Sequence, residues 1–259
     1  MSITLENVSY DYPQGKKKAL DNVSLTFRDG EITAVIGRSG SGKSTLLRLL
    51  NGLRKPTEGK IEGNTFDTAL VFQYPETQLF EETVIKDVEF GPKNKGRSEK
   101  ESREDAEEAL RMVGIGEDKW NVSPLALSGG EKRRVALAGI LAMKCSTLVL
   151  DEISSGLDGE GKRIVFDIIR KLSAEGKTVI FTTHDSEEAA RFSDRVILLE
   201  NGRVRSDGTI EDASECDSYF LTQGMKLKRM LENEGIRAEG KMTSLTDSIQ
   251  SLSSLLGME

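Results

Sequence analysis

The stretch from Gly37 to Thr45 constrains the fold of this chain more than any other feature. An apolar run, Ile32 to Ile36, predicts a buried strand before it, and the leucines of Leu46 to Leu50 predict a helix after it. The pattern G-x-x-x-x-G-K-[ST] in this context predicts a loop whose backbone N–H groups surround phosphate. A Gly/Ser turn that carries a lysine by chance is the alternative, but it does not explain the strand and the helix. We therefore expect a nucleoside triphosphate to bind through Gly37, Ser39, Gly40, Ser41, Gly42, Lys43, Ser44 and Thr45.

Composition excludes several classes of protein. The chain has 36 Lys and Arg against 43 Asp and Glu, a net charge of −7, which argues against a dedicated nucleic-acid-binding surface. Its two cysteines, Cys145 and Cys216, are far apart and fit a reducing compartment. The N-terminus lacks the basic and apolar regions of a secretory signal, and no segment approaches the roughly 18 apolar residues of a membrane helix. Contact with a membrane would therefore need a partner.

The hydrophobic pattern predicts an α/β fold. Short alternating strands between Ile3 and Phe27 indicate an antiparallel β layer, and Thr57 to Asn64 resembles a small hairpin. No strand is expected from about residue 74 to 144, where two helices, 98–113 and 128–143, indicate a helical insertion. Alternation of apolar strands with amphipathic helices elsewhere predicts a mainly parallel sheet covered on both faces. The expected strands of this sheet are 32–36, 69–73, 147–150, 178–182 and 195–199.

Polar residues follow several of these strands, at the sheet edge where ligands bind in such folds. Asp151 is expected to hold Mg²⁺ opposite Ser44, and Glu152 to act as the general base toward water. His184, the only histidine, could bond the γ-phosphate or orient that water, and Gln73 could bind Mg²⁺ or contact the water. Each residue alone is more often structural, but they are predicted to meet at one edge.

The segment Ser128 to Glu131 indicates a second anion site. Ser128 and Glu131 have the spacing of an ordinary capping box. That interpretation leaves Gly129 and Gly130 unexplained, whereas two glycines at a helix start expose N–H groups to an anion.

Together these motifs resemble the ATP-binding-cassette (ABC) ATPases, over roughly residues 3–209. Residues 37–45 match the Walker A loop, Gln73 the Q-loop, 127–131 the family signature and 148–152 Walker B with its catalytic glutamate. Residues 155–158 match the D-loop, and His184 matches the switch histidine. The resemblance implies a P-loop NTPase core and a tyrosine stacked on adenine, Tyr12 or, failing that, Tyr10. It also implies a head-to-tail dimer in which Ser128, Gly129 and Gly130 of one subunit cover the ATP of the other.

A narrower resemblance is to the ATPases of energy-coupling factor (ECF) importers, which take up vitamins or transition-metal ions. Residues 71–80 and 83–92 carry it. It implies a transmembrane coupling subunit, a substrate-binding membrane subunit and a location on the cytoplasmic face of the cell membrane. Plain packing of the helical insertion is the alternative explanation of residues 78–80. Departures from the family pattern are Ile153 for proline, Glu131 for glutamine, Tyr74 for the asparagine common in ECF members, and a short segment between Leu53 and Gln73.

We therefore expect an ABC ATPase domain over 1–209, with a helical subdomain at about 74–144, and a C-terminal helical extension over 210–259. An apolar stripe in that extension indicates either core packing or a dimer contact. The expected function is the motor of an ECF-type importer that uses ATP and Mg²⁺, with Lys43, Glu152 and His184 as catalytic residues. The alternatives are a soluble ABC ATPase, for example in iron–sulfur assembly, or the ATPase of another ABC transporter class. A non-enzymatic scaffold predicts a missing catalytic residue, and a kinase leaves residues 128–131 without a purpose. Whether the dimer partner is a second copy or a paralogue stays open.

Overall fold

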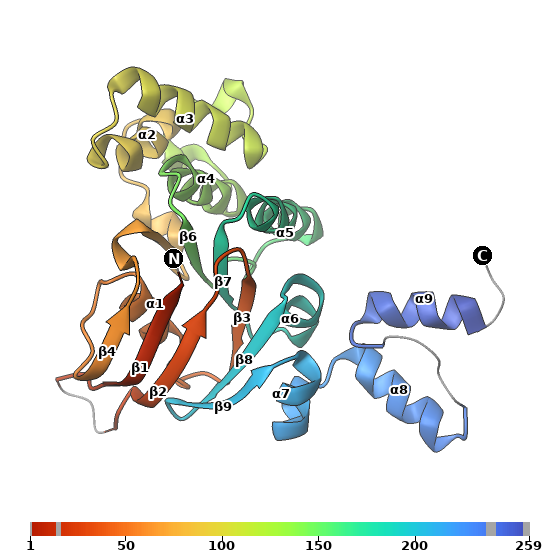
Figure 1. The fold of residues 1–259 in the computed structure, drawn as a ribbon. Helices are drawn as coiled ribbons and strands as arrows, with labels where there is room; N and C mark the ends of the chain where they lie inside the picture. Colours follow the sequence, from red (N-terminus) through yellow and green to blue (C-terminus); the bar gives the residue numbers. More distant parts are fainter. Residues whose placement is uncertain (1, 14–16, 237–241, 256–259) are drawn as a thin grey trace.

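Two β-sheets and a helical subdomain make up the body of the chain, and the computed structural model describes residues 2–13, 17–236 and 242–255. The larger sheet has six strands in the order β5-β6-β7-β3-β8-β9 (Figure 1). Its first five strands in this order pair in parallel, and only β9 runs antiparallel, to β8. The predicted mainly parallel sheet is confirmed. Its strands are β3 (Ile32–Ile36), β5 (Thr68–Val71), β6 (Thr147–Asp151), β7 (Thr178–Thr182), β8 (Arg195–Glu200) and β9 (Arg203–Gly208).

The smaller sheet is antiparallel and has the order β2-β1-β4, with β1 at Ile3–Tyr10, β2 at Leu20–Phe27 and β4 at Glu58–Glu62. The predicted antiparallel layer is confirmed, but the predicted hairpin over Thr57 to Asn64 is wrong. That segment supplies only β4, which pairs with β1 instead of folding back on itself. Gly59 allows this pairing: its φ is +80°, and a Cβ atom there would lie 2.4 Å from the backbone oxygens of Glu6 and Asn7.

Successive residues of the parallel strands point into two separate parts of the core, as alternation in a strand requires. In β3, Ala34 and Ile36 pack toward the helical subdomain and helices α5 and α6, whereas Val35 packs toward α1 and the smaller sheet. The sheet is therefore buried on both faces. The covering helices are α1 (Lys43–Leu50), α5 (Gly159–Ala174) and α6 (Ser186–Phe192).

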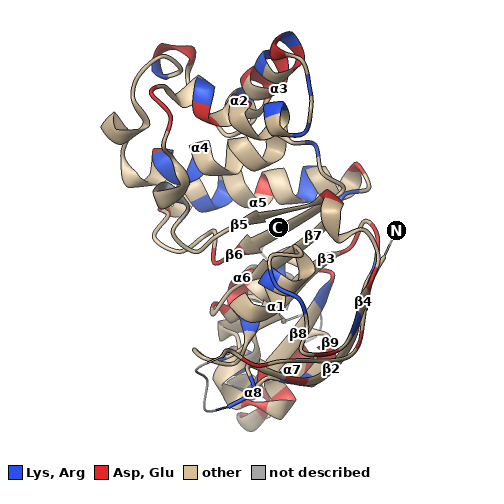
Figure 2. Ribbon diagram, turned by 90° about the vertical axis from the view of Figure 1, so that its left-hand side faces the viewer, with Lys and Arg blue, Asp and Glu red and all other residues tan. Residues whose placement is uncertain are grey.

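The helical subdomain lies between β5 and β6 in the sequence and forms the top of the molecule in Figure 1. Its three helices pack on one another, and capping boxes at Ser98 and Ser128 start two of them. Figure 2 shows Lys, Arg, Asp and Glu concentrated on α3, which is therefore the solvated helix of the three. The helices are α2 (Val84–Asn94), α3 (Glu99–Met112) and α4 (Gly129–Ala142); short 3-10 turns are η1 (Thr65–Asp67), η2 (Pro75–Gln78), η3 (Glu117–Lys119) and η4 (Pro124–Ala126).

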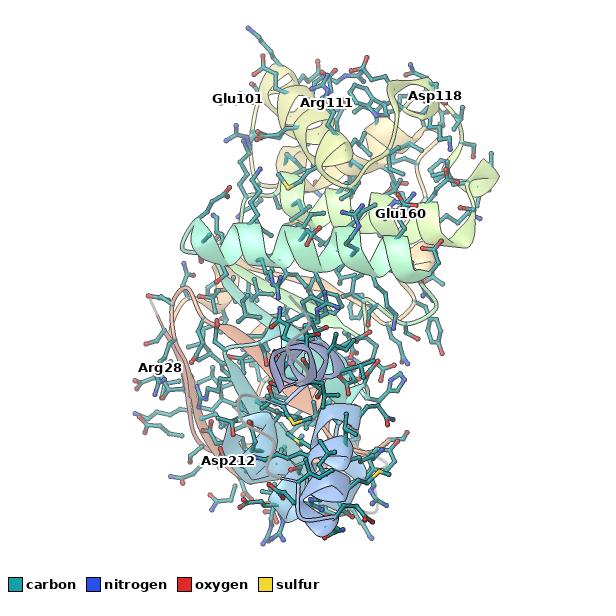
Figure 3. All side chains as sticks on the ribbon, turned by 90° about the vertical axis from the view of Figure 1, so that its right-hand side faces the viewer. Arg28, Glu101, Arg111, Asp118, Glu160 and Asp212 are labelled. Atoms are coloured by element: carbon teal, nitrogen blue, oxygen red, sulfur yellow. The ribbon has the colours of Figure 1, made fainter. Side chains whose placement is uncertain are left out.

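The C-terminal segment begins inside the core and ends outside it. Ile210, Phe220 and Met225 belong to the same hydrophobic cluster as the parallel strands. The rest of α8, with α9, projects from the body in Figure 1, and Figure 3 looks onto these helices from that side. No helix within the described residues is long and apolar enough to cross a membrane. The elements are α7 (Ile210–Cys216), η5 (Ser218–Phe220), α8 (Gln223–Asn233) and α9 (Leu245–Leu255).

Candidate nucleotide-binding site

The loop between β3 and α1 has the geometry of a phosphate cradle. Gly37 and Gly42 lie at φ of +154° and +108°, and a Cβ atom at either would lie 2.3 Å or 2.5 Å from a backbone oxygen, of Leu199 or Ala19. Only glycine fits these two positions. The loop then passes directly into α1, whose first residue is Lys43, so the positive end of the helix faces the loop.

Two polar residues of this loop have buried side chains. Lys43 is 7% exposed, and its ammonium donates to the carbonyl oxygens of Gly37, at 2.7 Å, and Arg38, at 3.2 Å. Burial lowers the pKa of Lys43, while the charges of Glu152 and Asp151 oppose that shift. The Ser41 hydroxyl is buried and has no hydrogen-bond partner. A phosphate group at the loop would stabilise the charge of Lys43.

The two acidic residues at the end of β6 are held by a threonine on the neighbouring strand. Thr182 lies opposite Asp151 in the sheet, donates its hydroxyl to Asp151 Oδ1 at 2.7 Å and accepts the Glu152 N–H at 2.9 Å. Glu152 has a φ of +49°, a conformation that residues other than glycine rarely adopt and that is concentrated at functional sites. Asp151 is 5% exposed. Sequence reasoning missed Thr182, although the strand register would have placed it beside Asp151.

Glu152 lies close to two other predicted site residues, Gln73 and His184. Its Oε2 accepts a hydrogen bond from Gln73 Nε2 at 3.1 Å and lies 3.8 Å from His184 Nδ1. Because β5 ends at Val71, Gln73 follows the strand by two residues rather than ending it. The predicted meeting of Gln73, Glu152 and His184 at one sheet edge is confirmed, and their roles stay predictions.

These residues and the loop line one cavity of about 730 Å³. Tyr12 lies at its rim, where its hydroxyl pairs with Thr45 Oγ1 at 3.2 Å and accepts from Arg48 at 3.1 Å. Burial alone would raise the Tyr12 pKa, but these two hydrogen bonds and the charge of Arg48 lower it overall. Tyr10 is 6% exposed and packs in the core, so Tyr12 is the better placed of the two. The cavity is lined by Tyr12, Ala19, Gly37, Arg38, Ser39, Gly40, Ser41, Gly42, Lys43, Ser44, Thr45, Gln73, Glu152, His184 and Tyr219.

The structure does not bring the signature residues to this cavity. Ser128 and Gly130 line a different, open cavity of about 480 Å³ together with the D-loop residues Leu157 and Asp158. Glu131 completes the capping box with Ser128 and forms an ion pair with Lys119. Hydrogen bonds from Lys119 and Ser128 lower the pKa of Glu131 to about 2. Lys119 therefore compensates locally for the acid that stands where the family has glutamine.

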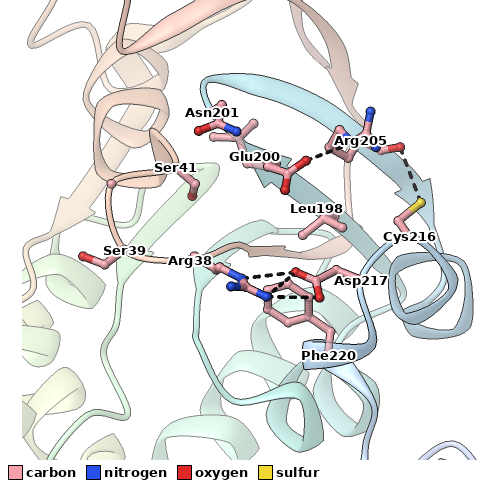
Figure 4. Close-up of a pocket in the computed structure, with 12 residues that line it drawn as sticks. Arg38, Ser39, Ser41, Leu198, Glu200, Asn201, Arg205, Cys216, Asp217 and Phe220 are labelled. Carbon is pink, nitrogen blue, oxygen red and sulfur yellow. Dashed lines mark hydrogen bonds and ion pairs between the residues drawn. The ribbon is translucent and has the colours of Figure 1, made fainter. Parts of the chain in front are cut away.

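A further cavity of about 480 Å³ lies beside the phosphate loop (Figure 4). Arg38 forms a two-pronged pair with Asp217, at 3.2 Å and 3.3 Å, and its guanidinium lies 5.0 Å from the centre of the Tyr219 ring. These contacts join the loop to the start of the C-terminal segment. Sequence reasoning missed them, because nothing in the spacing of Arg38 and Asp217 indicates a contact.

The residues present fit both ATP and Mg²⁺. The cradle, the buried Lys43 and the open cavity suit a triphosphate with its base near Tyr12. The Ser44 hydroxyl, the Gln73 amide and the Asp151 carboxylate supply oxygen donors, which Mg²⁺ prefers. Among the described residues no group of three His, Cys, Asp or Glu side chains could hold a metal, so any site of this kind uses mixed donors.

Comparison with known proteins agrees with this geometry. Residues 20–155 match the family described as ABC transporter. The energy-coupling factor transporter ATP-binding protein EcfA2 of Streptococcus sanguinis is 47% identical over 227 residues, which are 80% of this chain and 81% of that protein. EcfA2 of Streptococcus pneumoniae is 45% identical over 244 residues, 86% of each chain.

Solved structures show the same fold. The ATP-binding cassette MJ0796, in a dimeric post-hydrolysis state bound to ADP and Pi, has a TM-score of 0.73 and 32% identity over 80% of this chain and 98% of that one. CbiO1 from Clostridium perfringens, part of the ABC transporter complex cbiONQ, has a TM-score of 0.73 and 32% identity over 90% of this chain and 96% of that one. The predicted α/β P-loop fold and family resemblance are thus confirmed: the chain belongs to the ABC transporter ATP-binding proteins, in the group of the energy-coupling factor ATPases.

Proposed function

We propose that the chain is the ATP-hydrolysing motor subunit of an ECF-type importer. The observation that carries this proposal is the position of the Glu152 carboxylate. It lines the phosphate-loop cavity and lies next to both Gln73 and His184, where an attacking water would need a base. The identity of the chain to EcfA2 proteins over most of its length supports the narrower assignment to ECF importers.

Each residue of the site has a proposed role. The loop amides and Lys43 bind the β- and γ-phosphates, and Tyr12 stacks on the base. Glu152 accepts the proton of the attacking water, and His184 orients the reacting groups. Thr182 holds Asp151 and Glu152 in place through its two hydrogen bonds.

A bound Mg²⁺ would neutralise charge on the phosphates, and Ser44, Gln73 and Asp151 are the residues proposed to hold it. Because Asp151 is buried and bonded to Thr182, we propose that it acts through water.

The separation of the two half-sites supports a head-to-tail dimer. Ser128, Gly129 and Gly130 are proposed to cover the γ-phosphate bound by a second subunit, which is either another copy or a paralogue. The dimeric cassette MJ0796 is a structural precedent for the assembly of two cassettes. Closure of the dimer around ATP would then move a transmembrane coupling subunit, which works with a substrate-binding membrane subunit.

Membrane association is proposed to be peripheral, at the cytoplasmic face, through these subunits. The aromatic side chains near the Q-loop are exposed at three positions, Tyr74, Phe80 and Phe90. The Phe80 and Phe90 rings pack edge to face, with 4.8 Å between their centres. Exposed aromatic pairs of this kind suit a protein contact.

Purification from detergent-extracted membranes tests the function. We expect the full-length chain to bring hydrophobic subunits with it and to hydrolyse ATP. The matched variant Lys43→Ala should bring the same subunits but lack hydrolysis. A chain that hydrolyses ATP yet brings no membrane subunit would overturn the importer assignment in favour of a soluble ABC ATPase.

A further inference from the structure

Helix α6 begins two residues after His184. Its two adjacent glutamates, Glu187 and Glu188, form hydrogen bonds with different parts of the chain. Glu188 is 5% exposed and points into the catalytic loops. Its Oε2 accepts from Ser154 Oγ at 2.7 Å and from Thr183 Oγ1 at 2.8 Å. Its other oxygen accepts from Lys162 Nζ at 2.7 Å. Glu188 therefore ties the residue before His184 to the segment that leads into the D-loop.

Glu187 binds the C-terminal helices instead. Its Oε1 accepts the backbone N–H of Gln223 at 2.6 Å, and its Oε2 accepts the backbone N–H of Leu245 at 2.9 Å. These are the first residues of α8 and α9. The first N–H groups of a helix have no partner within the helix, so one carboxylate satisfies an otherwise unpaired donor of each helix.

The starts of α8 and α9 pack closely against each other. Thr222 and Ser248 are fully buried. A Cβ atom on Gly224 would lie 2.5 Å from the Ser244 carbonyl oxygen, so α8 lies directly against the turn that starts α9. Glu187 therefore binds the starts of two helices that are packed on each other.

We propose that Glu187 is a positioning residue that couples the switch-histidine loop to the C-terminal helices. Since only Asp185 and Ser186 separate His184 from Glu187, a shift of His184 toward a bound triphosphate moves the start of α6. Glu188 links that shift to the D-loop side, and Glu187 carries it to α8 and α9. The position of α8 and α9 thus depends on whether ATP is bound at the nucleotide site. This inference rests on the proposed function, because it needs ATP to bind at the loop.

Amide hydrogen exchange at Gln223 and Leu245 tests the coupling directly, since Glu187 is the acceptor of both N–H groups. The measurement uses the full-length chain with Glu152→Gln, with and without Mg²⁺ and ATP. We expect exchange at these two amides to differ at least about threefold between the two conditions. In Glu187→Ala both amides should exchange at least about tenfold faster, and their response to ATP should disappear.

The matched control is Asp217→Asn, which removes the Arg38 ion pair between the phosphate loop and the extension but keeps an N-cap side chain for η5. Its response to ATP should persist. ATP affinity is measured in the same samples, so that a chain that fails to bind ATP overturns the proposed function together with the coupling. The coupling alone is overturned if ATP binds but the two amides do not respond, or if Glu187→Ala responds as the parent does.

Discussion

The phosphate-loop cavity and the signature cavity differ in how complete each is within one chain. The first is built from the ends of buried parallel strands, and it combines the glycine-rich loop, the Glu152 carboxylate and His184. The second is an open surface at the start of α4, where Ser128 and Gly130 lie beside the D-loop. Neither Glu152 nor Lys43 lines this second cavity.

We propose that the two cavities are unequal half-sites. The phosphate-loop cavity offers ATP a phosphate cradle, Lys43 and the Glu152 carboxylate. The signature cavity offers an anion the helix-start N–H groups, Ser128 and the Arg134 side chain. Substitutions in the first half should therefore damage the chemistry, and substitutions in the second should damage assembly around ATP.

The largest effect is expected at Glu152. Glu152→Gln removes the base but keeps the shape and a bond to Gln73, so turnover should fall by roughly 10²–10⁴ while ATP binding is kept. Steady-state hydrolysis and equilibrium binding measure the two effects. Glu215→Gln, at an exposed position of α7, controls for the loss of one negative charge. Turnover within threefold of wild type would remove Glu152 from the role of base.

The signature half can be tested against a built-in control. Ser98 and Ser128 both cap a helix through a capping box, so alanine at either should destabilise the fold by about 1 kcal/mol. Only Ser128→Ala should also lower hydrolysis, by about 10- to 100-fold, because it removes a hydrogen bond to a charged phosphate. Equal hydrolysis in the two variants would mean that Ser128 is a cap and nothing more. Thermal unfolding and ATPase rates give both quantities.

A smaller effect is expected at the rim of the phosphate-loop cavity. Tyr12→Ala should weaken ATP binding by about 5- to 30-fold through loss of stacking on the base. Tyr12→Phe keeps the ring and loses only the bonds to Thr45 and Arg48, so its affinity should stay close to wild type. If the two variants bind ATP equally well, the base does not stack on this ring.

The smallest effect concerns Lys119. Lys119→Met leaves the Glu131 charge uncompensated, so the free energy of unfolding at pH 7 should fall only slightly, since Lys119 is exposed and solvent screens the pair. The folded-state pKa of Glu131 is depressed to about 2. The pair therefore stabilises the fold above the unfolded pKa of about 4.3, and this contribution is lost as pH falls toward 2.

Denaturant unfolding of wild type and Lys119→Met over that range measures the loss. The difference between them should shrink as the solution is acidified. A difference that grows on acidification would contradict the ion pair. With Glu131→Gln added to both proteins, the difference between them should no longer depend on pH.

Sequence alone predicted the parts of the site that depend on short patterns. The loop from Gly37 to Thr45, the acids after β6 and the helix start at Ser128 each combine local turn chemistry with hydrophobic periodicity. That combination sufficed for the parallel sheet and for the convergence of Gln73, Glu152 and His184. The hairpin expected at Thr57 to Asn64 was wrong because β4 pairs with a strand about fifty residues earlier, which local pattern cannot indicate.

The remaining contacts were missed because they join segments far apart in the sequence. The pair of Arg38 and Asp217 spans 179 residues, and Glu187 reaches Leu245 across 58. No spacing rule relates such positions. The domain boundary at residue 209, and the choice between core packing and a dimer contact for the C-terminal stripe, stay predictions.

Complementation between two inactive variants tests the shared site most directly. Lys43→Ala lacks a working loop, and Ser128→Arg lacks a working signature, so each full-length chain alone should hydrolyse little ATP. In a random mixture of self-associating chains, half of the dimers would contain one intact composite site, and about a quarter of wild-type activity should return. If the chain pairs with a paralogue, the same two substitutions placed in separate subunits should leave one site intact. A site built from two chains would be contradicted if Ser128→Arg alone hydrolysed ATP at the full wild-type rate. It would also be contradicted if ATP hydrolysis recovered neither in the mixture nor in the paralogue pairing.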